Sequence, residues 1–379
     1  MTSENTSGTV SPKTTVAVLC GGRSSEHPIS LITACGVLGA IDSDKYEVIT
    51  IGITPEGKWY QTDLKSLQEF TAQGPTAHFT GSELEVFVPM GGGDTRFRLV
   101  DSNGHLSFTG SVDVVFPLLH GPFGEDGTVQ GLLEMADLKY VGCGVASSAL
   151  GMDKHFMKVA FEAAGLQVGP YEVVSKRQWG HDAQAVKARI EQLGFPVFVK
   201  PARAGSSFGI TKVDSVAGLD EAIAEAHSFD PKLVIEAGIE GREIECAVLD
   251  TPHGGVPRAS HPGEIVVMDE DTDFYDFEAK YVSTTSAQTR CPAHLPQDVQ
   301  DKIRKLAVEA FLALDGEGLS RADFFYTTNG DIVINEVNTM PGFTPISMYK
   351  TMWEATGIEY HELIEELIQL ALARPLGLR

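Results

Sequence analysis

The chain has 379 residues, of which 42% are hydrophobic and 21% charged, the balance of a globular protein long enough for two or three domains. Its formal net charge of −23 argues against a surface that binds nucleic acid or an anionic membrane, although a local lysine cluster can still bind a small anion. The five cysteines are scattered and never spaced as CxxC, which favours reduced thiols in a cytoplasmic protein over disulfides or a zinc site.

The sequence gives no sign of a membrane segment. No apolar run approaches the length of a membrane span, so we expect no membrane partner. Residues 1–13 are polar and lack the apolar stretch of a signal peptide, which predicts a disordered tail.

Residues 14–145 predict a parallel α/β domain. An apolar strand that ends in Gly21-Gly22, a helical pattern and a second apolar strand form a βαβ opening, which indicates a parallel sheet. Short strands, a buried strand and further helices follow. The expected elements are strands at 14–22, 46–54, 85–90, 97–100, 105–110 and 112–121, and helices at 29–42, 63–70 and 127–137.

Residues 146–237 predict a small α+β unit, and residues 238–379 a third unit in which strands dominate. The stretch "FPVFVKPARAGSSFGITKV" is typical of two antiparallel strands joined by a glycine-serine loop. The other expected elements are helices at 147–165, 215–228, 296–315 and 358–373, strands at 232–239 and 241–250, and a hairpin at 319–338.

The hairpin "LSRADFFYTTNGDIVINEVN" carries acids at one end. Asn329-Gly330 is a strong signal for a two-residue turn. The side chains opposed by such a turn would be Thr328 and Asp331, Asp323 and Glu336, and Arg321 and Asn338. Opposed carboxylates about 5 Å apart need a proton or a cation between them, and oxygen ligands of this kind suit Mg²⁺. The hairpin alone also fits solvated charges at a frayed end.

Two segments carry lysines in positions that suit an anion. Lys200 lies on a strand before a Gly-Ser loop whose backbone N–H groups can bind phosphate oxygens, although the loop is not a P-loop. Lys154 lies in the first turn of a helix, where a cation is disfavoured unless an anion binds nearby. A flexible hairpin loop would also explain the segment after Lys200, and a simple helix cap by Asp153 would also explain the segment around Lys154.

Three further segments gather polar side chains with glycines or in a long loop. His120, Glu125 and Asp126 follow a buried strand, at the edge where open α/β sheets bind ligands. Glu26 follows Gly21-Gly22, and this is not a GxGxxG motif. The stretch "DTDFYDFEAKYVS" has no clean period, so a functional lid and an acidic surface loop both remain open.

Seven segments, taken in order, resemble the D-alanine–D-alanine ligases, a family of the ATP-grasp superfamily. They span about residues 14–373 and include "GGRSSEHPIS", "LHGPFGEDGTVQG", "GMDKHFMK", "VKPARAGSSFG", "FYDFEAKY", "RADFF" and "NEVNTMPGFTPISM". The resemblance implies a three-domain ATP-grasp fold with an N-terminal parallel α/β domain and a lid at 262–284. It also implies a cytoplasmic homodimer that makes D-alanyl-D-alanine for peptidoglycan. In this reaction ATP phosphorylates one D-alanine, and the amine of a second attacks the acyl phosphate.

The same resemblance assigns roles to individual residues. Two Mg²⁺ or Mn²⁺ ions on the ATP phosphates are expected at Asp323, Glu336 and Asn338. ATP is expected at Lys154, Phe198, Lys200, Ser206, Ser207, Glu236, Ala237, Ile239, Glu243 and Lys280. The D-alanines are expected at Glu26, His120, Arg321, Gly342, Ser347 and Met348. Catalytic roles are expected for Glu26, Ser206, Tyr281, Arg321 and Gly342.

Two residues depart from the family pattern, and three other functions compete with this interpretation. Ala204 stands where many relatives have glutamate, and Ala237 where some have lysine, so only backbone contacts to adenine carry over at 237. A ligase that joins D-alanine to D-lactate is disfavoured by Tyr281. A carboxylase-type ATP-grasp enzyme is disfavoured by the Glu26 segment and by the absence of a biotin-carrier motif. A non-enzymatic nucleotide-binding module would leave costly charges without a function.

Overall fold

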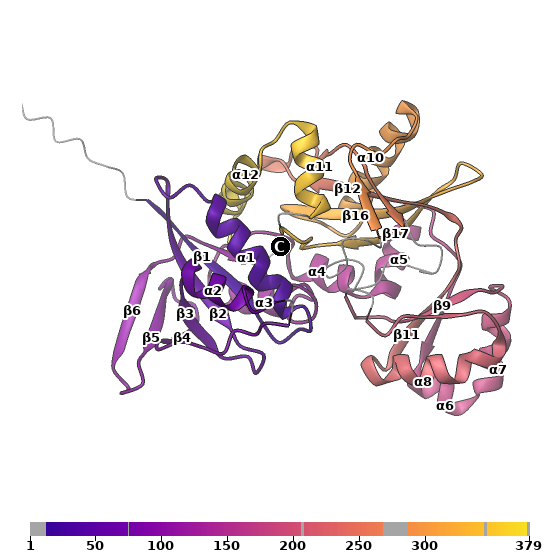
Figure 1. Cartoon of the computed structure of the whole chain (residues 1–379), viewed down its shortest axis with the longest axis horizontal. Coiled ribbons are helices and arrows are strands. Elements are labelled where there is room, and N and C mark those ends of the chain that lie inside the picture. Colours follow the sequence, from indigo (N-terminus) through magenta and orange to yellow (C-terminus); the bar gives the residue numbers. More distant parts are fainter. Residues whose placement is uncertain (1–12, 75, 206–207, 268–286, 345–346, 377–379) are drawn as a thin grey trace, which may run out of the picture.

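The computed structural model describes residues 13–74, 76–205, 208–267, 287–344 and 347–376 (Figure 1). The predicted tail therefore lies outside the described residues except for Lys13. The described residues form three sheets and the helices that cover them. In Figure 1 the seven-stranded sheet lies at the lower left and the four-stranded sheet at the lower right, with the six-stranded sheet above and between them. All five cysteines are free, as predicted. Within these ranges no helix has both the length and the apolar composition to cross a membrane.

The seven-stranded sheet has the order β6-β5-β4-β3-β2-β1-β7. As predicted, β1 is parallel to β2; it is also parallel to β7, while β3 to β6 extend the sheet as an antiparallel meander. The strands are β1 (Thr14–Gly21), β2 (Tyr46–Ile53), β3 (Trp59–Thr62), β4 (Glu85–Phe87), β5 (Arg96–Val100), β6 (Leu106–Ser111) and β7 (Val114–Pro117). The helices are α1 (His27–Ala40), α2 (Leu64–Thr71) and α3 (Thr128–Met135).

Strand β1 is apolar from Val16 to Cys20 because both of its faces are covered there. Val16 and Val18 belong to a core that includes α1, whereas Ala17 and Leu19 belong to a core that includes α3. Side chains alternate between the faces of a strand, so a strand covered on both sides needs apolar residues at every position. This burial ends at Gly21-Gly22, where the chain turns toward Glu26.

The four-stranded sheet is antiparallel in the order β10-β9-β11-β8. The predicted pairing of the strands on either side of the glycine-serine loop is confirmed, since β9 and β10 are neighbours. Three helices cover one face of this sheet (Figure 1). The elements are β8 (Tyr171–Ser175), α6 (Lys176–His181), α7 (Ala183–Glu191), β9 (Val197–Pro201), β10 (Thr211–Val213), η1 (Val216–Gly218), α8 (Leu219–Phe229) and β11 (Lys232–Ala237).

The six-stranded sheet is also antiparallel and has the order β15-β14-β12-β16-β17, with β13 paired to β12. Helices α5 and α10 pack on one face, and α11 and α12 connect the other face to the first sheet. The strands are β12 (Gly241–Leu249), β13 (Arg258–Ala259), β14 (Gly263–Val267), β15 (Ala287–Arg290), β16 (Leu319–Thr327) and β17 (Ile332–Asn338). The helices are α4 (Val145–Met152), α5 (Lys154–Ala163), η2 (Pro252–Gly254), α10 (Gln297–Ala313), α11 (Met348–Thr356) and α12 (Tyr360–Ala373).

The helix predicted at 147–165 is two helices, which meet at Asp153. This residue has φ −93° and ψ 101°, which ends α4, and its carboxylate accepts hydrogen bonds from the backbone N–H groups of His155 and Phe156. The side chain therefore acts as the N-cap of α5. Apolar periodicity runs through the break, so it does not reveal it, but Asp153 is the cap residue that the sequence offered.

The turn between β16 and β17 is longer than predicted. The backbone N–H of Thr327 donates to the carbonyl of Asp331 at 2.9 Å, so residues 328–330 form a three-residue loop. Gly330 supplies its left-handed position with a φ of +85°. The expected opposition of Thr328 and Asp331 is therefore wrong, because Asn329-Gly330 does not form the whole turn.

A β-bulge restores the predicted register at the acidic end of the hairpin. Asp323 faces Glu336, but Phe324 faces Ile334, which leaves Asn335 as an extra residue on β17. The bulge cancels the one-residue offset of the longer loop. The expected opposition of Asp323 with Glu336 and of Arg321 with Asn338 is therefore confirmed.

Phe343 connects the first sheet to the C-terminal helices. Its side chain is fully buried, with ring centroids 6.2 Å from Phe116 of β7 and 5.2 Å from Tyr349 of α11. We expect Phe343→Ala to lower the free energy of unfolding by about 3–5 kcal/mol, because it leaves a cavity where the two parts meet. Urea unfolding measures this, with Leu312→Ala on the exposed face of α10 as the control. A loss no larger than that of the control would contradict this packing.

Candidate functional site

A cleft of about 570 Å³ lies where the three sheets meet, and every described residue assigned a role from the sequence lines it. The first sheet contributes Glu26 and His120. Helix α5 and the four-stranded sheet with the residues after it contribute Lys154, Phe198, Lys200, Glu236, Ala237 and Ile239. The six-stranded sheet and the loop after it contribute Glu243, Arg321, Asp323, Glu336, Asn338, Gly342, Ser347 and Met348. Ser206, Ser207, Lys280, Tyr281 and most of the predicted lid lie outside the described residues.

Basic side chains surround the acids at the end of the hairpin. The Arg321 guanidinium donates to both oxygens of Asp323, at 2.8 and 2.7 Å, and Asn338 Nδ2 donates to Asp323 Oδ2 at 3.0 Å. Lys154 Nζ lies 3.6 Å from Glu336 Oε2 and donates to the carbonyl of Ala204 at 3.0 Å. This arrangement supplies the positive charge that two opposed carboxylates require.

The donor set at this end fits Mg²⁺ that also binds phosphate. Among the described residues no group of three or more His, Cys, Asp or Glu side chains is placed to hold a metal. The set here has only two carboxylates, Asp323 and Glu336, and one amide, Asn338. Mg²⁺ commonly takes one or two carboxylates and completes its shell with water and substrate phosphates. The set therefore suits a metal that arrives with a nucleotide.

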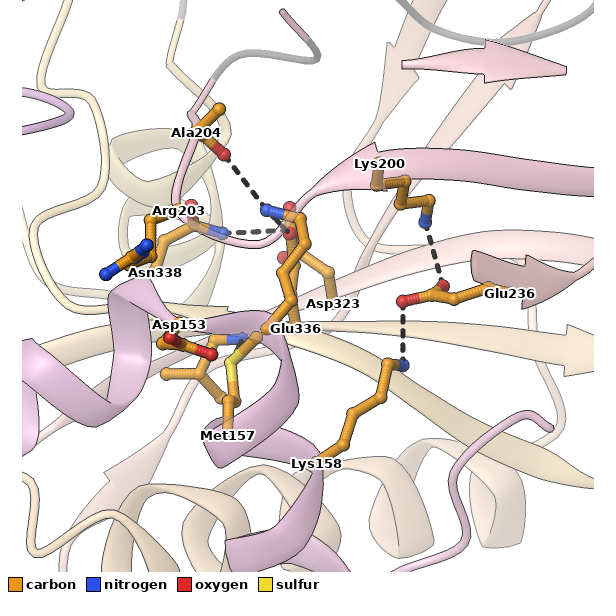
Figure 2. Close-up of polar contacts among 12 residues, drawn as sticks. Asp153, Met157, Lys158, Lys200, Arg203, Ala204, Glu236, Asp323, Glu336 and Asn338 are labelled. Carbon is orange, nitrogen blue, oxygen red and sulfur yellow. Dashed lines mark hydrogen bonds and ion pairs between the residues drawn. The ribbon is translucent and has the colours of Figure 1, made fainter. Parts of the chain in front are cut away.

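A second charged group lies at the other end of the cleft. Glu236 on β11 accepts from Lys200 Nζ at 2.8 Å, and Lys158 Nζ of α5 lies 3.2 Å from its other oxygen (Figure 2). Burial would raise the pKa of Glu236, but Lys200 and Lys158 outweigh it and lower the pKa to about 2. Phe198 faces Glu236 across the strands, and its ring centroid is 5.9 Å from Lys200 Nζ. An apolar ring and an ionised acceptor thus lie side by side.

Glu26 lies against the segment that leads into the glycine-serine loop. The backbone of Gly205 approaches Glu26 so closely that an added Cβ would overlap Oε1 of the carboxylate. At Gly121 an added Cβ would come within 2.9 Å of the same oxygen. The structure therefore brings residues 26, 121 and 205 together, although they are far apart in the sequence, and the φ of +72° at Gly121 favours glycine at that contact.

His120 is buried and neutral. Its Nδ1 lies 3.2 Å from the carbonyl oxygen of Met340 and its Nε2 lies 3.0 Å from the hydroxyl of Thr33. The carbonyl only accepts, so Nδ1 carries the proton and Nε2 accepts from the hydroxyl. Burial lowers the pKa of His120 to about 4, which agrees with a neutral ring. His120 thereby connects the first sheet to the loop that carries Gly342.

Gly342, Ser347 and Met348 form one corner of the cleft. An added Cβ at Gly342 would lie 3.1 Å from Ser347 Oγ, and this hydroxyl accepts from the backbone N–H of Thr344 at 2.9 Å. Ser347 is the N-cap of α11 and Met348 begins that helix. Unpaired N–H groups at a helix N-terminus favour an anion, so the corner suits a carboxylate.

Charged residues without a role assigned from the sequence include Glu125 and Glu245 in the cleft wall and Lys158 behind it. Glu125 accepts from the backbone N–H of Gly121 at 2.7 Å and lies with Glu26 in the cleft. Glu245 faces Asp323 across β12 and lies 3.4 Å from Arg321. Lys158 contacts Glu236. The sequence does mark the segment around Glu125 as a candidate ligand-binding segment. Glu245 and Lys158 look like ordinary residues of a strand and a helix until the strands are paired.

Comparison with known proteins identifies the family. The family model described as D-ala D-ala ligase N-terminus matches residues 15–143, and the one described as D-ala D-ala ligase C-terminus matches residues 160–369. The chain belongs to the D-alanine–D-alanine ligase family. The D-alanine–D-alanine ligases of Pseudarthrobacter chlorophenolicus and Kocuria rhizophila are both 58% identical to it, over 97% of this chain and 96% of theirs.

Solved structures share the fold along almost the whole chain. The D-alanine–D-alanine ligase from Coxiella burnetii superposes with a TM-score of 0.79 at 33% identity, covering 96% of this chain and 94% of that one. The VanG D-Ala:D-Ser ligase from Enterococcus faecalis has a TM-score of 0.79 at 34% identity, covering 95% and 100%. The predicted ATP-grasp fold is confirmed by these neighbours.

Membership in this family establishes the reaction. The chain ligates two D-alanines to D-alanyl-D-alanine, with release of ADP and phosphate and a D-alanyl phosphate intermediate. The dipeptide serves the synthesis of peptidoglycan precursors. The predicted enzyme class and the predicted use of ATP are therefore confirmed.

Glu125 makes the stability of the protein depend on pH. Burial, followed by the charge of Glu26, raises its pKa from 4.5 to about 8. Between these two pH values the folded protein keeps a proton that the unfolded chain has lost, so the free energy of unfolding falls as the pH rises. Glu125→Gln cannot ionise, so we expect it to resist urea better than the parent at pH 8 and to gain much less at pH 5.

Urea unfolding at both pH values measures this effect, with Glu191→Gln on the exposed face of α7 as the control. The control should keep the pH dependence of the parent protein. An equally strong pH dependence in Glu125→Gln would show that another group is responsible.

Proposed function

We propose that the cleft binds ATP between the four-stranded and six-stranded sheets, with two Mg²⁺ or Mn²⁺ ions at its phosphates. The observation that carries this proposal is the meeting of Asp323, Glu336 and Asn338 with Lys154 and Arg321 at one end of a single cleft. When bound, such ions neutralise phosphate charge and orient the transferred group. Asp323, Glu336 and Asn338 would hold them.

The lysines and the aromatic end of the cleft position the nucleotide in this proposal. Lys154 and Lys200 bind phosphate oxygens, and both are supported by their place on the cleft wall. Adenine lies against Phe198 and beside Glu236. The described residues Ala237, Ile239 and Glu243 take the backbone contacts and the ribose, and Ser206, Ser207 and Lys280 keep the phosphate roles expected from the sequence.

The D-alanines lie toward the first sheet. Glu26 holds the ammonium group of the first D-alanine, with His120 beside it, and the corner of Ser347 and Met348 receives the carboxylate of the second. Arg321 and the backbone N–H of Gly342 stabilise the oxyanion that develops when the second amine attacks the acyl phosphate. Ser206 and Tyr281 link to Glu26, a role supported by the close approach of Gly205 to that carboxylate.

We further propose the division of the chain into domains 14–145, 146–237 and 238–379, a homodimer and a cytoplasmic location. The three sheets fall within these ranges, although α5 packs on the six-stranded sheet. The five free cysteines suit a reducing compartment. Sedimentation of the purified protein tests the dimer directly.

Glu336 tests the metal assignment. We expect Glu336→Gln to lower turnover by at least about a thousandfold, because one of the two carboxylates that would hold the ions is lost while the size of the side chain is kept. Phosphate release and dipeptide formation measure this, and Glu309→Gln on α10 is a control of the same chemistry at the surface. Near-normal ligation by Glu336→Gln would overturn the metal assignment.

The choice of the second substrate is tested separately, since one structural neighbour is a D-Ala:D-Ser ligase. We expect D-alanine alone to support phosphate release and to yield only the dipeptide, whether or not D-lactate or D-serine is added at neutral pH. A mass spectrum of the products distinguishes the three. Depsipeptide or D-alanyl-D-serine as the main product would overturn the assignment of the second substrate site.

A further inference from the structure

Lys158 is a buried lysine that forms an ion pair with Glu236, a residue of the cleft wall. It lies one helical turn after Lys154 on α5, and its side chain is 2% exposed. Its ammonium group lies 3.2 Å from Glu236 Oε1 (Figure 2). The same ammonium group lies 5.8 Å from the ring centroid of Tyr171. A charge this deeply buried is costly unless it is paired, so Glu236 is its required partner.

The two lysines on Glu236 differ in their access to the cleft. Lys200 lines the cleft, so its ammonium group can turn from Glu236 to a phosphate. Lys158 is not among the residues that line the cleft, and it approaches Glu236 from the side of α5. Lys200 is therefore the lysine that a ligand in the cleft can draw away from Glu236, while the 2% exposed Lys158 stays paired from the side of α5.

The loss of Lys200 would leave Glu236 dependent on Lys158. A carboxylate buried without a cation takes up a proton. An ionised carboxylate only accepts hydrogen bonds, whereas a protonated one also donates. The charge state of Glu236 therefore decides which groups on a nucleotide base it can bind.

We propose that Lys158 is a positioning residue that keeps Glu236 ionised and in place as a hydrogen-bond acceptor for the nucleotide base while Lys200 binds phosphate. This inference rests on the function proposed above for Glu236 and Lys200. An acceptor at this position favours a base that presents an amine, as adenine does, over one that presents a carbonyl oxygen, as hypoxanthine does. Lys158 thus contributes to the preference for ATP over ITP without touching either.

Lys158→Met is the direct test, because methionine fills similar space without the charge. We expect the KM for ATP to rise about tenfold, which corresponds to one lost hydrogen bond to a charged acceptor, and kcat to change by less than about twofold. The preference for ATP over ITP, measured as the ratio of kcat/KM, should fall by about the same tenfold factor. Lys158→Arg should restore both values, because it restores the charge.

Lys232→Met is the matched control. Lys232 of β11 also binds an acid of α5, since its Nζ donates to Asp153 Oδ1 at 2.6 Å, but it does not line the cleft. We expect this variant to lower the melting temperature and to leave the KM for ATP and the preference over ITP unchanged. If it shifts them as much as Lys158→Met does, loosened packing of α5 on β11 is the cause and the proposal is wrong.

Glu236→Gln distinguishes an error in the adenine site from an error in the role of Lys158. If this variant binds ATP like the parent, adenine does not lie beside Glu236 and the proposed function is wrong at this point. If Glu236→Gln raises the KM for ATP and a folded Lys158→Met does not, only the role of Lys158 is overturned. Should Lys158→Met fail to fold, Lys158→Gln keeps a hydrogen-bond donor without the charge and is held to the same expected values.

Discussion

Three acidic side chains stand in one row across the six-stranded sheet, and the structure depends on the cations that balance them. Glu245, Asp323 and Glu336 face one another on β12, β16 and β17. Arg321 lies 3.4 Å from the first and 2.7 Å from the second, and Lys154 lies 3.6 Å from the third. Because opposed like charges destabilise a sheet, this row forms only where helix α5 brings Lys154 to its end.

The same helix carries charge to both ends of the cleft, and the loop after β17 connects the remaining side. Lys154 and Lys158 lie one turn apart on α5, so one rigid element supports the acids of the hairpin and the acid of β11. On the opposite side, Met340 receives a hydrogen bond from His120, and its N–H lies 3.4 Å from Glu125. The site is thus built from side chains that also hold the three sheets in place.

The sequence predicts most elements, and residues that line one cleft in the structure, better than it predicts the turns and junctions between elements. The predicted register of Asp323 with Glu336 is correct only because two deviations cancel. The loop is one residue longer than a two-residue turn, and Asn335 is an extra bulge residue on β17. Turn signals describe short-range preference, and bulges depend on packing against neighbouring strands. Glu245 and Lys158 could not be assigned for a related reason, because their partners are known only once β12, β16 and α5 have been positioned.

Helices α11 and α12 complete a core that begins at the other end of the chain. Val16 and Phe116 of the first sheet and Leu31 of α1 share this core with Trp353 and Leu367. During synthesis the completed first sheet, which ends at Pro117, therefore exposes one apolar face until about 250 further residues, up to Leu367, have left the ribosome. At ordinary rates of elongation this interval is tens of seconds, long enough for a chaperone to bind. The final helix thus sets the moment at which the first domain becomes independent of such protection.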